Sequence, residues 1–106
     1  MFNNGSRYAT KGVMEEVGLD VQSTIWNIIE ELGKSKKLDY LQVFECSVDM
    51  VKNEAGELQR LQKIIHKQEV PRYKKLHHFK VENPIQCKIF VIDSEEYSTI
   101  LLAEEY

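Results

Sequence analysis

The sequence DVQSTIWNIIEELG, from Asp20 to Gly33, carries the clearest helix pattern in the chain. Asp20 is placed to cap its first turn, because a carboxylate accepts hydrogen bonds from free backbone amides. Gly33 is placed to end it, because glycine adopts the left-handed conformation without a steric penalty. A helix of this length is marginally stable alone, so it must pack on other elements. The residues available for packing recur at helical spacing in a single apolar stripe: Val21, Ile25, Ile28, Ile29 and Leu32.

Strand-like segments supply the surface on which this stripe can pack. In YLQVFECSV, Phe44 and Cys46 face one side, whereas Leu41 and Val43 face the other. QCKIFVID and YSTILLAEEY flank a short polar loop, as in a hairpin, and are apolar on both faces. The predicted strands are residues 7–13, 40–48, 62–70, 75–81, 86–93 and 97–106.

Two patterns overlap in the segment ELQRLQKIIHKQEV, which begins at Glu57. One pattern places Leu58, Leu61, Ile64 and Ile65 on one face of a helix. The other places Ile64, His66, Gln68 and Val70 on one face of a strand. Pro71 favours an extended conformation for the residue before it. We therefore predict a strand over about residues 62–70, which forms a long hairpin with residues 40–48.

Together these elements predict an α+β fold in the order β-α-β-β-β-β-β. The sheet is mostly antiparallel, with about five to six strands, and helix 20–33 packs on one face. The hairpin at residues 86–103 is apolar on both sides, so the second face also needs a cover. Either residues 54–67 form a second helix or another copy covers this face as a symmetric homodimer, and we favour the homodimer. We expect residues 1–106 to form a single domain whose first six residues fray.

The composition is typical of a folded globular protein: 42% hydrophobic and 29% charged residues, with a net charge of −3. No apolar run approaches the roughly 20 residues that span a bilayer, and the N-terminus has no secretory pattern. We expect a cytoplasmic protein that does not bind membranes. Cys46 and Cys87 each lie in an apolar run, so we interpret them as small buried hydrophobes. No cofactor or metal is expected.

Positive charge is concentrated between Arg60 and Lys80, where seven Lys or Arg residues accompany one acid. The rest of the chain holds seven such cations and sixteen acids. The basic segment also carries aromatic residues, a mixture that can hold anionic groups. We expect its partner to be a protein or an acidic ligand rather than nucleic acid, which the acidic remainder would repel. The candidate binding residues are Arg60, Lys63, His66, Lys67, Arg72, Tyr73, Lys74, Lys75 and His77.

A catalytic role is the alternative hypothesis, with a pocket built around His66, Tyr73 and His77. The sequence contains no phosphate-binding glycine pattern and no nucleophile elbow. On a strand, His66 and Glu69 point to opposite faces, which weakens an acid–base pair. The sequence therefore favours a non-catalytic binding module over a small enzyme.

Most of the chain resembles a small family of Gram-positive bacteria and their phages, domain of unknown function 960. The resemblance is carried by RYATKGVMEEV, the helix with its Trp26, LDYLQVFE, IIHKQEVPRYKK and, above all, KIFVIDSEEYSTILLAEEY. The connection around residues 51–60 is longer than in the family pattern. The resemblance implies a cytoplasmic accessory protein of bacterial or phage origin, and it implies no activity, cofactor or catalytic residue.

Overall fold

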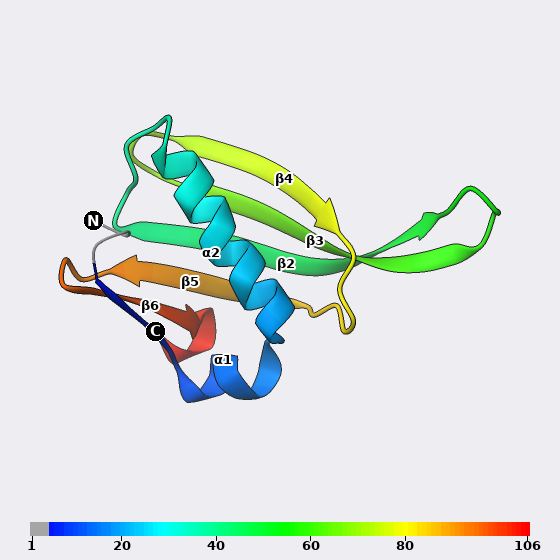
Figure 1. Cartoon of the computed structure of the whole chain (residues 1–106), viewed down its shortest axis with the longest axis horizontal. Coiled ribbons are helices and arrows are strands. Elements are labelled where there is room, and N and C mark those ends of the chain that lie inside the picture. Colours follow the sequence, from blue (N-terminus) through cyan, green and yellow to red (C-terminus); the bar gives the residue numbers. More distant parts are fainter. Residues whose placement is uncertain (1–4) are drawn as a thin grey trace.

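The computed structural model describes residues 5–106 as two layers, a sheet with one main helix across it (Figure 1). The strands lie in the order β1-β6-β5-β2-β3-β4; β1 runs parallel to β6, and the other neighbours are antiparallel. The prediction of an α+β fold with a mostly antiparallel sheet and one main helix is confirmed. The elements are β1 (Ser6–Ala9), α1 (Lys11–Glu16), α2 (Leu19–Gly33), β2 (Leu41–Lys52), β3 (Leu58–Gln68), β4 (Tyr73–Phe79), β5 (Cys87–Asp93), β6 (Tyr97–Leu102) and the 3-10 helix η1 (Ala103–Glu105).

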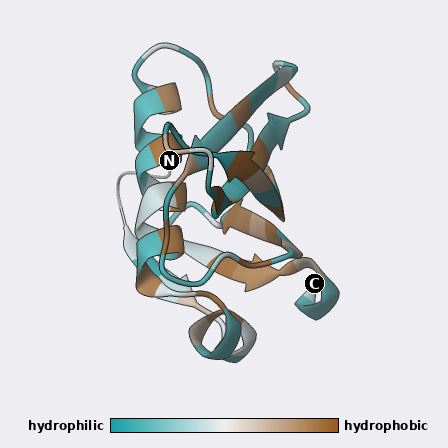
Figure 2. Ribbon diagram, turned by 90° about the vertical axis from the view of Figure 1, so that its right-hand side faces the viewer, coloured by the Kyte–Doolittle hydropathy of each residue, from teal (hydrophilic) through white to brown (hydrophobic). Residues whose placement is uncertain are grey.

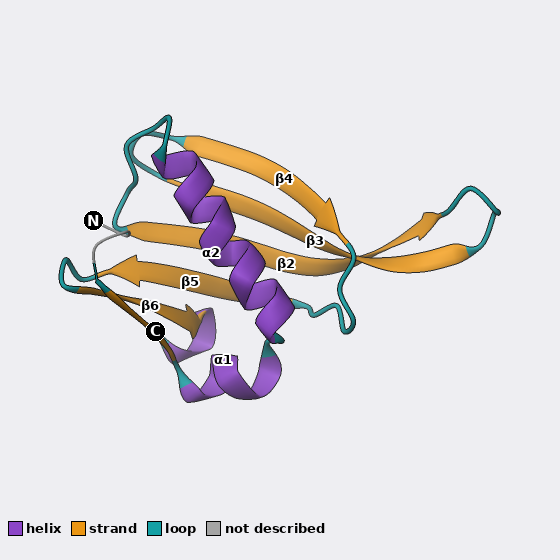
Figure 3. Ribbon diagram, viewed as in Figure 1, coloured by secondary structure: helices purple, strands orange, loops and turns teal. Residues whose placement is uncertain are grey.

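The hydrophobic core lies between α2 and the face of the sheet that it crosses (Figure 3). Val21, Ile25 and Ile29 of α2 are completely buried. They belong to one cluster with side chains from the strands, and each buried aliphatic side chain contributes roughly 1.5–3 kcal/mol. Within residues 5–106, no helix combines the length and the hydropathy needed to cross a membrane. The strand residues of the cluster are Phe44, Cys46, Ile64, Ile89, Val91, Ile100 and Leu102.

The main helix ends at Gly33 as predicted, but Asp20 is not its N-cap residue and Gly33 is not left-handed. The helix begins at Leu19, with Gly18 at the N-cap position, so Asp20 lies inside the first turn. Its carboxylate still accepts a hydrogen bond of 2.8 Å from the Val21 amide of that turn. It also accepts one of 3.3 Å from the Glu82 amide, which fastens the loop after β4 to the helix. Gly33 is the last helical residue and does not adopt a positive φ; Lys34 follows it in a right-handed conformation.

The N-terminal strand is shorter than predicted, because residues 11–16 form α1 instead. The Thr10 hydroxyl accepts a bond of 3.3 Å from the Val13 amide and so caps this helix. The Glu105 carboxylate then accepts bonds from the Thr10 hydroxyl at 2.6 Å and the Gly12 amide at 3.1 Å. These contacts from the far end of the chain favour a helix where local sequence favours a strand. Of the predicted frayed residues 1–6, residues 1–4 lie outside the described part, and Ser6 already belongs to β1.

The ambiguous segment is a strand, β3, and the alternative of a helix over residues 54–67 is wrong. It pairs with β2 from Val43–Lys67 to Lys52–Leu58, so the predicted hairpin is confirmed and is longer than expected. Its far end projects beyond the rest of the sheet as an arm (Figure 1). The turn at its tip contains Gly56, whose φ of +80° suits a residue without a side chain. At the C-terminus, the predicted strand 97–106 ends at Leu102, before η1.

Replacing Ile29 with Ala should lower the free energy of unfolding by about 2–5 kcal/mol, because a fully buried aliphatic side chain is removed. Ile28 is only half-buried and serves as the matched control, with a smaller expected loss. Urea denaturation followed by circular dichroism measures both values. Equal losses for the two variants would contradict the observed orientation of the stripe.

Candidate functional site

The face of the sheet opposite α2 carries no main helix, as the edge-on view shows (Figure 2). Because side chains alternate along each strand, every second residue points to this open face. The central strands place Leu41, Val43 and Phe90 there, all half-buried. Neighbouring positions carry lysines, so the open face is partly apolar and partly basic. Its basic residues are Lys63, Lys67, Lys74, His78 and Lys88.

A groove of about 580 Å³ lies on the open face, at the end of the sheet where β3 turns into β4. Leu41 and Val43 form its apolar floor, and the Tyr40 side chain, 56% exposed, borders it. Cations and acids surround this floor from four segments of the chain. The charged lining residues are Asp39, Glu45, Lys67, Glu69, Arg72, Lys74 and Lys88.

Two of the three acids in this groove are already engaged. The Glu45 carboxylate forms an ion pair with Lys67 at 3.0 Å. The Asp39 carboxylate accepts hydrogen bonds from three backbone amides, including that of Val70 at 3.1 Å. The remaining groove cations are Arg72, Lys74 and Lys88. None of these three has an ion-pair partner among residues 5–106. The third acid, Glu69, stands against these three cations, so the groove carries a small net positive charge around an apolar floor.

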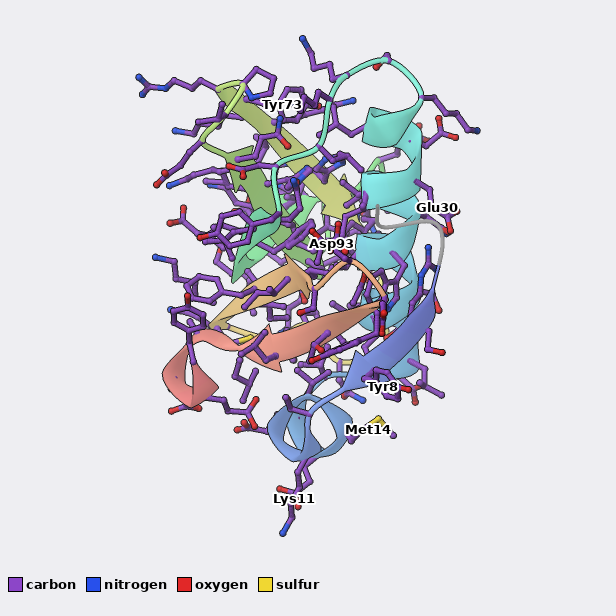
Figure 4. All side chains as sticks on the ribbon, turned by 90° about the vertical axis from the view of Figure 1, so that its left-hand side faces the viewer. Tyr8, Lys11, Met14, Glu30, Tyr73 and Asp93 are labelled. Carbon is purple, nitrogen blue, oxygen red and sulfur yellow. The ribbon has the colours of Figure 1, made fainter. Side chains whose placement is uncertain are left out.

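A second groove, of about 450 Å³, lies on the other side of β4, between this strand and the C-terminal half of α2. Lys75 and His77 line it from the strand, and Asn27 and Glu31 line it from the helix. Tyr73 borders both grooves, and Figure 4 shows it at the end of the sheet near the last turn of α2.

A row of buried polar side chains runs beneath this region. His66 is completely buried, and its Nε2 lies 2.6 Å from the Gln42 Oε1. The Gln42 amide nitrogen in turn donates to the Gln68 Oε1 at 2.7 Å, and the Gln68 amide nitrogen donates to the Pro71 carbonyl at 2.9 Å. Since the Gln42 Oε1 can only accept, Nε2 of His66 carries the hydrogen, and its Nδ1 keeps a lone pair.

Two imidazole nitrogens in this region are buried without a hydrogen-bond partner, Nδ1 of His66 and Nε2 of His77. The His66 ring stacks on Phe44, with centroids 4.5 Å apart, and meets the edge of Tyr73. Burial, and secondarily the neighbouring His77, lower the pKa of His66 to about 4, so the ring is neutral at pH 7. Burial also lowers the pKa of His77. Among residues 5–106, no group of three His, Cys, Asp or Glu residues is placed to hold a metal ion.

The predicted site residues do not lie on one surface. Lys67, Arg72 and Lys74 line the open-face groove, whereas Lys75 and His77 line the groove beside α2. Tyr73 belongs to both grooves, His66 is buried beneath them, and Lys63 lies farther along the open face. Arg60 lies in the projecting arm, opposite Met50.

Several groove residues lie outside the predicted basic segment. Lys88 is the most important of them, and it reaches the groove because β5 pairs with β2 and sets Lys88 opposite Glu45. No local pattern announces this, since Lys88 is a single lysine in an apolar strand. Alternation placed Leu41 and Val43 on the face opposite Phe44 and Cys46, but their place beside the cations depends on the strand order.

Stability should fall with acid because of His66. Its pKa of about 4 in the folded state lies below the ordinary 6.5, so the unfolded chain binds the extra proton between these values. This contribution is therefore present above pH 6.5 and is lost as the pH falls to 4, a change of about 3 kcal/mol. Measured by urea denaturation across this range, the free energy of unfolding should vary less with pH for His66→Gln than for the wild type. His77→Gln should change this pH dependence in the same direction. If the free energy of unfolding varies equally with pH in His66→Gln and the wild type, the lowered pKa of His66 is refuted.

Comparisons with known proteins agree with the fold and leave the activity open. No curated protein matches the sequence. A crystal structure described as a protein of unknown function from Enterococcus faecalis is similar, with a TM-score of 0.72 and 23% sequence identity. The match covers 96% of this chain and 91% of that one, and at this identity it shows the fold alone. A family model described as a Staphylococcal protein of unknown function, DUF960, matches residues 6–105, and the chain belongs to this family.

Proposed function

We propose that this protein is a non-catalytic binding module whose open-face groove takes an acidic, partly apolar segment of a protein partner. The observation that carries the proposal is a set of three cations, Arg72, Lys74 and Lys88, which surround the floor of Leu41 and Val43 and have no ion-pair partner among residues 5–106. A carboxylate-bearing segment gains ion pairs with the cations and buries apolar surface on the floor. Like charges across the groove disfavour a basic partner.

A second copy of this chain is the competing occupant of the open face, as the sequence analysis favoured. In a symmetric dimer the same patch meets itself. Each copy would bring the same excess of cations, four against three acids in the groove, and this like net charge costs free energy. A partner with the opposite charge meets no such cost, so the charge distribution supports the acidic segment.

The proposal can be tested with a fluorescent twelve-residue peptide in which Glu alternates with Leu, measured by anisotropy. A peptide with Lys in place of Glu and one with Ser in place of Leu are the controls. We expect the Glu-Leu peptide to bind best and its affinity to fall as salt rises, because the contributing charges are exposed. Equal binding of the Lys-Leu peptide would overturn the proposal. So would a wild-type dimer, seen by light scattering, that the peptide does not dissociate.

The double change Lys74→Glu with Lys88→Glu should weaken binding of this peptide by about tenfold or more, since two attractive contacts become repulsive. Lys75→Glu with Lys80→Glu is the matched control, because both lysines are exposed, Lys75 lies on the opposite face, and the net charge changes equally. The control should bind within about twofold of the wild type. A similar loss in both variants would show that net charge, rather than the groove, determines binding.

A second candidate function, a small-molecule site in the groove beside α2, is favoured by His77, which lines this groove and whose buried Nε2 has no hydrogen-bond partner among residues 5–106. A ligand with a complementary polar group would satisfy this nitrogen. Burial lowers the pKa of His77, which makes the ring a weaker base and supports binding rather than proton transfer. The test is to record the imidazole nitrogen chemical shifts by NMR while a fragment library is added. A fragment that moves the His77 signals of the wild type, and that no longer binds His77→Gln, would support this candidate; signals that no fragment moves would reject it.

A further inference from the structure

Cys46 in β2 and Cys87 in β5 are partners in the register of two neighbouring antiparallel strands. Both side chains point to the face that α2 covers, where Cys46 belongs to the core and Cys87 packs against it. The sequence analysis treated them as two separate hydrophobes, because their contact depends on the pairing of β2 with β5. We propose that Cys46 and Cys87 form a dithiol site, which a hydroperoxide converts into an intramolecular disulfide.

The ladder places the two residues at a distance that a disulfide can span. The Asp93 amide donates to the Tyr40 carbonyl at 2.8 Å, which makes this pair a hydrogen-bonded one. Such pairs alternate along an antiparallel ladder, so Cys46 and Cys87 form another. Their Cα atoms are then about 5.5 Å apart, inside the disulfide range of about 4.4–6.8 Å. Closing the bond must draw the Cβ atoms together by roughly 1 Å, and this strain makes the disulfide easy to reduce.

The two thiols differ in a way that assigns their roles. Cys46 is 4% exposed, whereas Cys87 is only half-buried. The neighbouring Cys46 thiol lowers the pKa of Cys87, against the opposing effects of burial, Glu16 and Glu104. The neighbouring Cys87, together with burial, raises the pKa of Cys46. Cys87 is therefore the thiolate that meets the oxidant, and Cys46 is the thiol that resolves it.

The reaction balances with one hydroperoxide per disulfide. The Cys87 Sγ, after releasing its proton to solvent, attacks one peroxide oxygen; an S–O bond forms, the O–O bond breaks, and the leaving hydroxide takes up a proton. The Cys46 Sγ then attacks the Cys87 sulfur; the S–S bond forms, and the S–O bond breaks. The departing hydroxide takes the Cys46 proton and leaves as water. The two sulfurs lose two electrons in total, and the peroxide gains them.

Intact-protein mass spectrometry of the wild type, titrated with hydrogen peroxide and then alkylated with N-ethylmaleimide, tests the proposal. We expect a monomer that is lighter by two hydrogens and carries no maleimide, with a peptide that links Cys46 to Cys87. Dithiothreitol should restore two alkylation sites. The chain has two cysteines, so no other thiol competes. A wild type that gains oxygen atoms, or forms disulfide-linked dimers, without this species overturns the proposal.

The separate roles are tested with single substitutions, after circular dichroism has shown native folding. Before oxidation, Cys87 of the wild type should be alkylated about tenfold or more faster than Cys46, because it is more exposed and its pKa is lower. In Cys46→Ser the resolving thiol is gone, so the sulfenic acid of Cys87 should persist and react with dimedone. Cys87→Ser should leave Cys46 unreactive toward peroxide. If neither serine variant folds, the wild-type alkylation rates decide alone, and equal rates overturn the assignment.

Discussion

One fifteen-residue helix can cover only one face of a six-stranded sheet, and this limit shapes the rest of the molecule. The apolar stripe of α2 removes Val21, Ile25 and Ile29 from water together with every second residue of the central strands. The intervening residues of the same strands are left on the open face. A strand such as β5 is therefore apolar on one side because that side forms the core. The apolar residues on its other side need a separate explanation.

This limit also explains why alternation was such a reliable guide to the strands. Phe44 and Cys46 were separated correctly from Leu41 and Val43. In a strand with one buried face, alternate residues must point to the core and the residues between them away from it. The segment 58–67 was ambiguous only because its isoleucines are adjacent, at positions 64 and 65, and fit both periods. Its pairing with β2 over ten residues decided the matter, and this long-range contact outweighed local preference.

Most of the features that sequence reasoning missed depend on contacts between distant segments. Lys11 to Glu16 form a helix because Glu105 holds Thr10 and Gly12, and no local pattern predicts such a bond. The N-cap position of α2 is a local exception: Gly18 takes it, and Asp20, two residues later, accepts from the Val21 amide at 2.8 Å. The parallel pairing of β1 with β6 likewise joins the two ends of the chain.

The candidate site illustrates the same division. A run of cations in sequence predicts local charge, but a strand sends neighbouring side chains to opposite faces, so Lys74 and Lys75 lie on different surfaces. Conversely, Lys88 joins the open-face cations only through the pairing of β5 with β2. Charge density along the chain could therefore indicate that a basic surface exists. Only the register could show which residues share it.

The two faces are nevertheless linked through the buried amide of Gln68. Gln68 points to the helix-covered face, where its Oε1 accepts from the Asp39 amide at 3.0 Å and its nitrogen donates to the Pro71 carbonyl at 2.9 Å. These bonds hold Asp39, just before β2, and Pro71, in the turn before β4. The next residues along the chain, Tyr40 and Arg72, line the open-face groove. A buried amide that satisfies loop backbone groups rigidifies those loops. Hydrogen bonds made on the helix-covered face of the sheet thus set the shape of the groove on the open face.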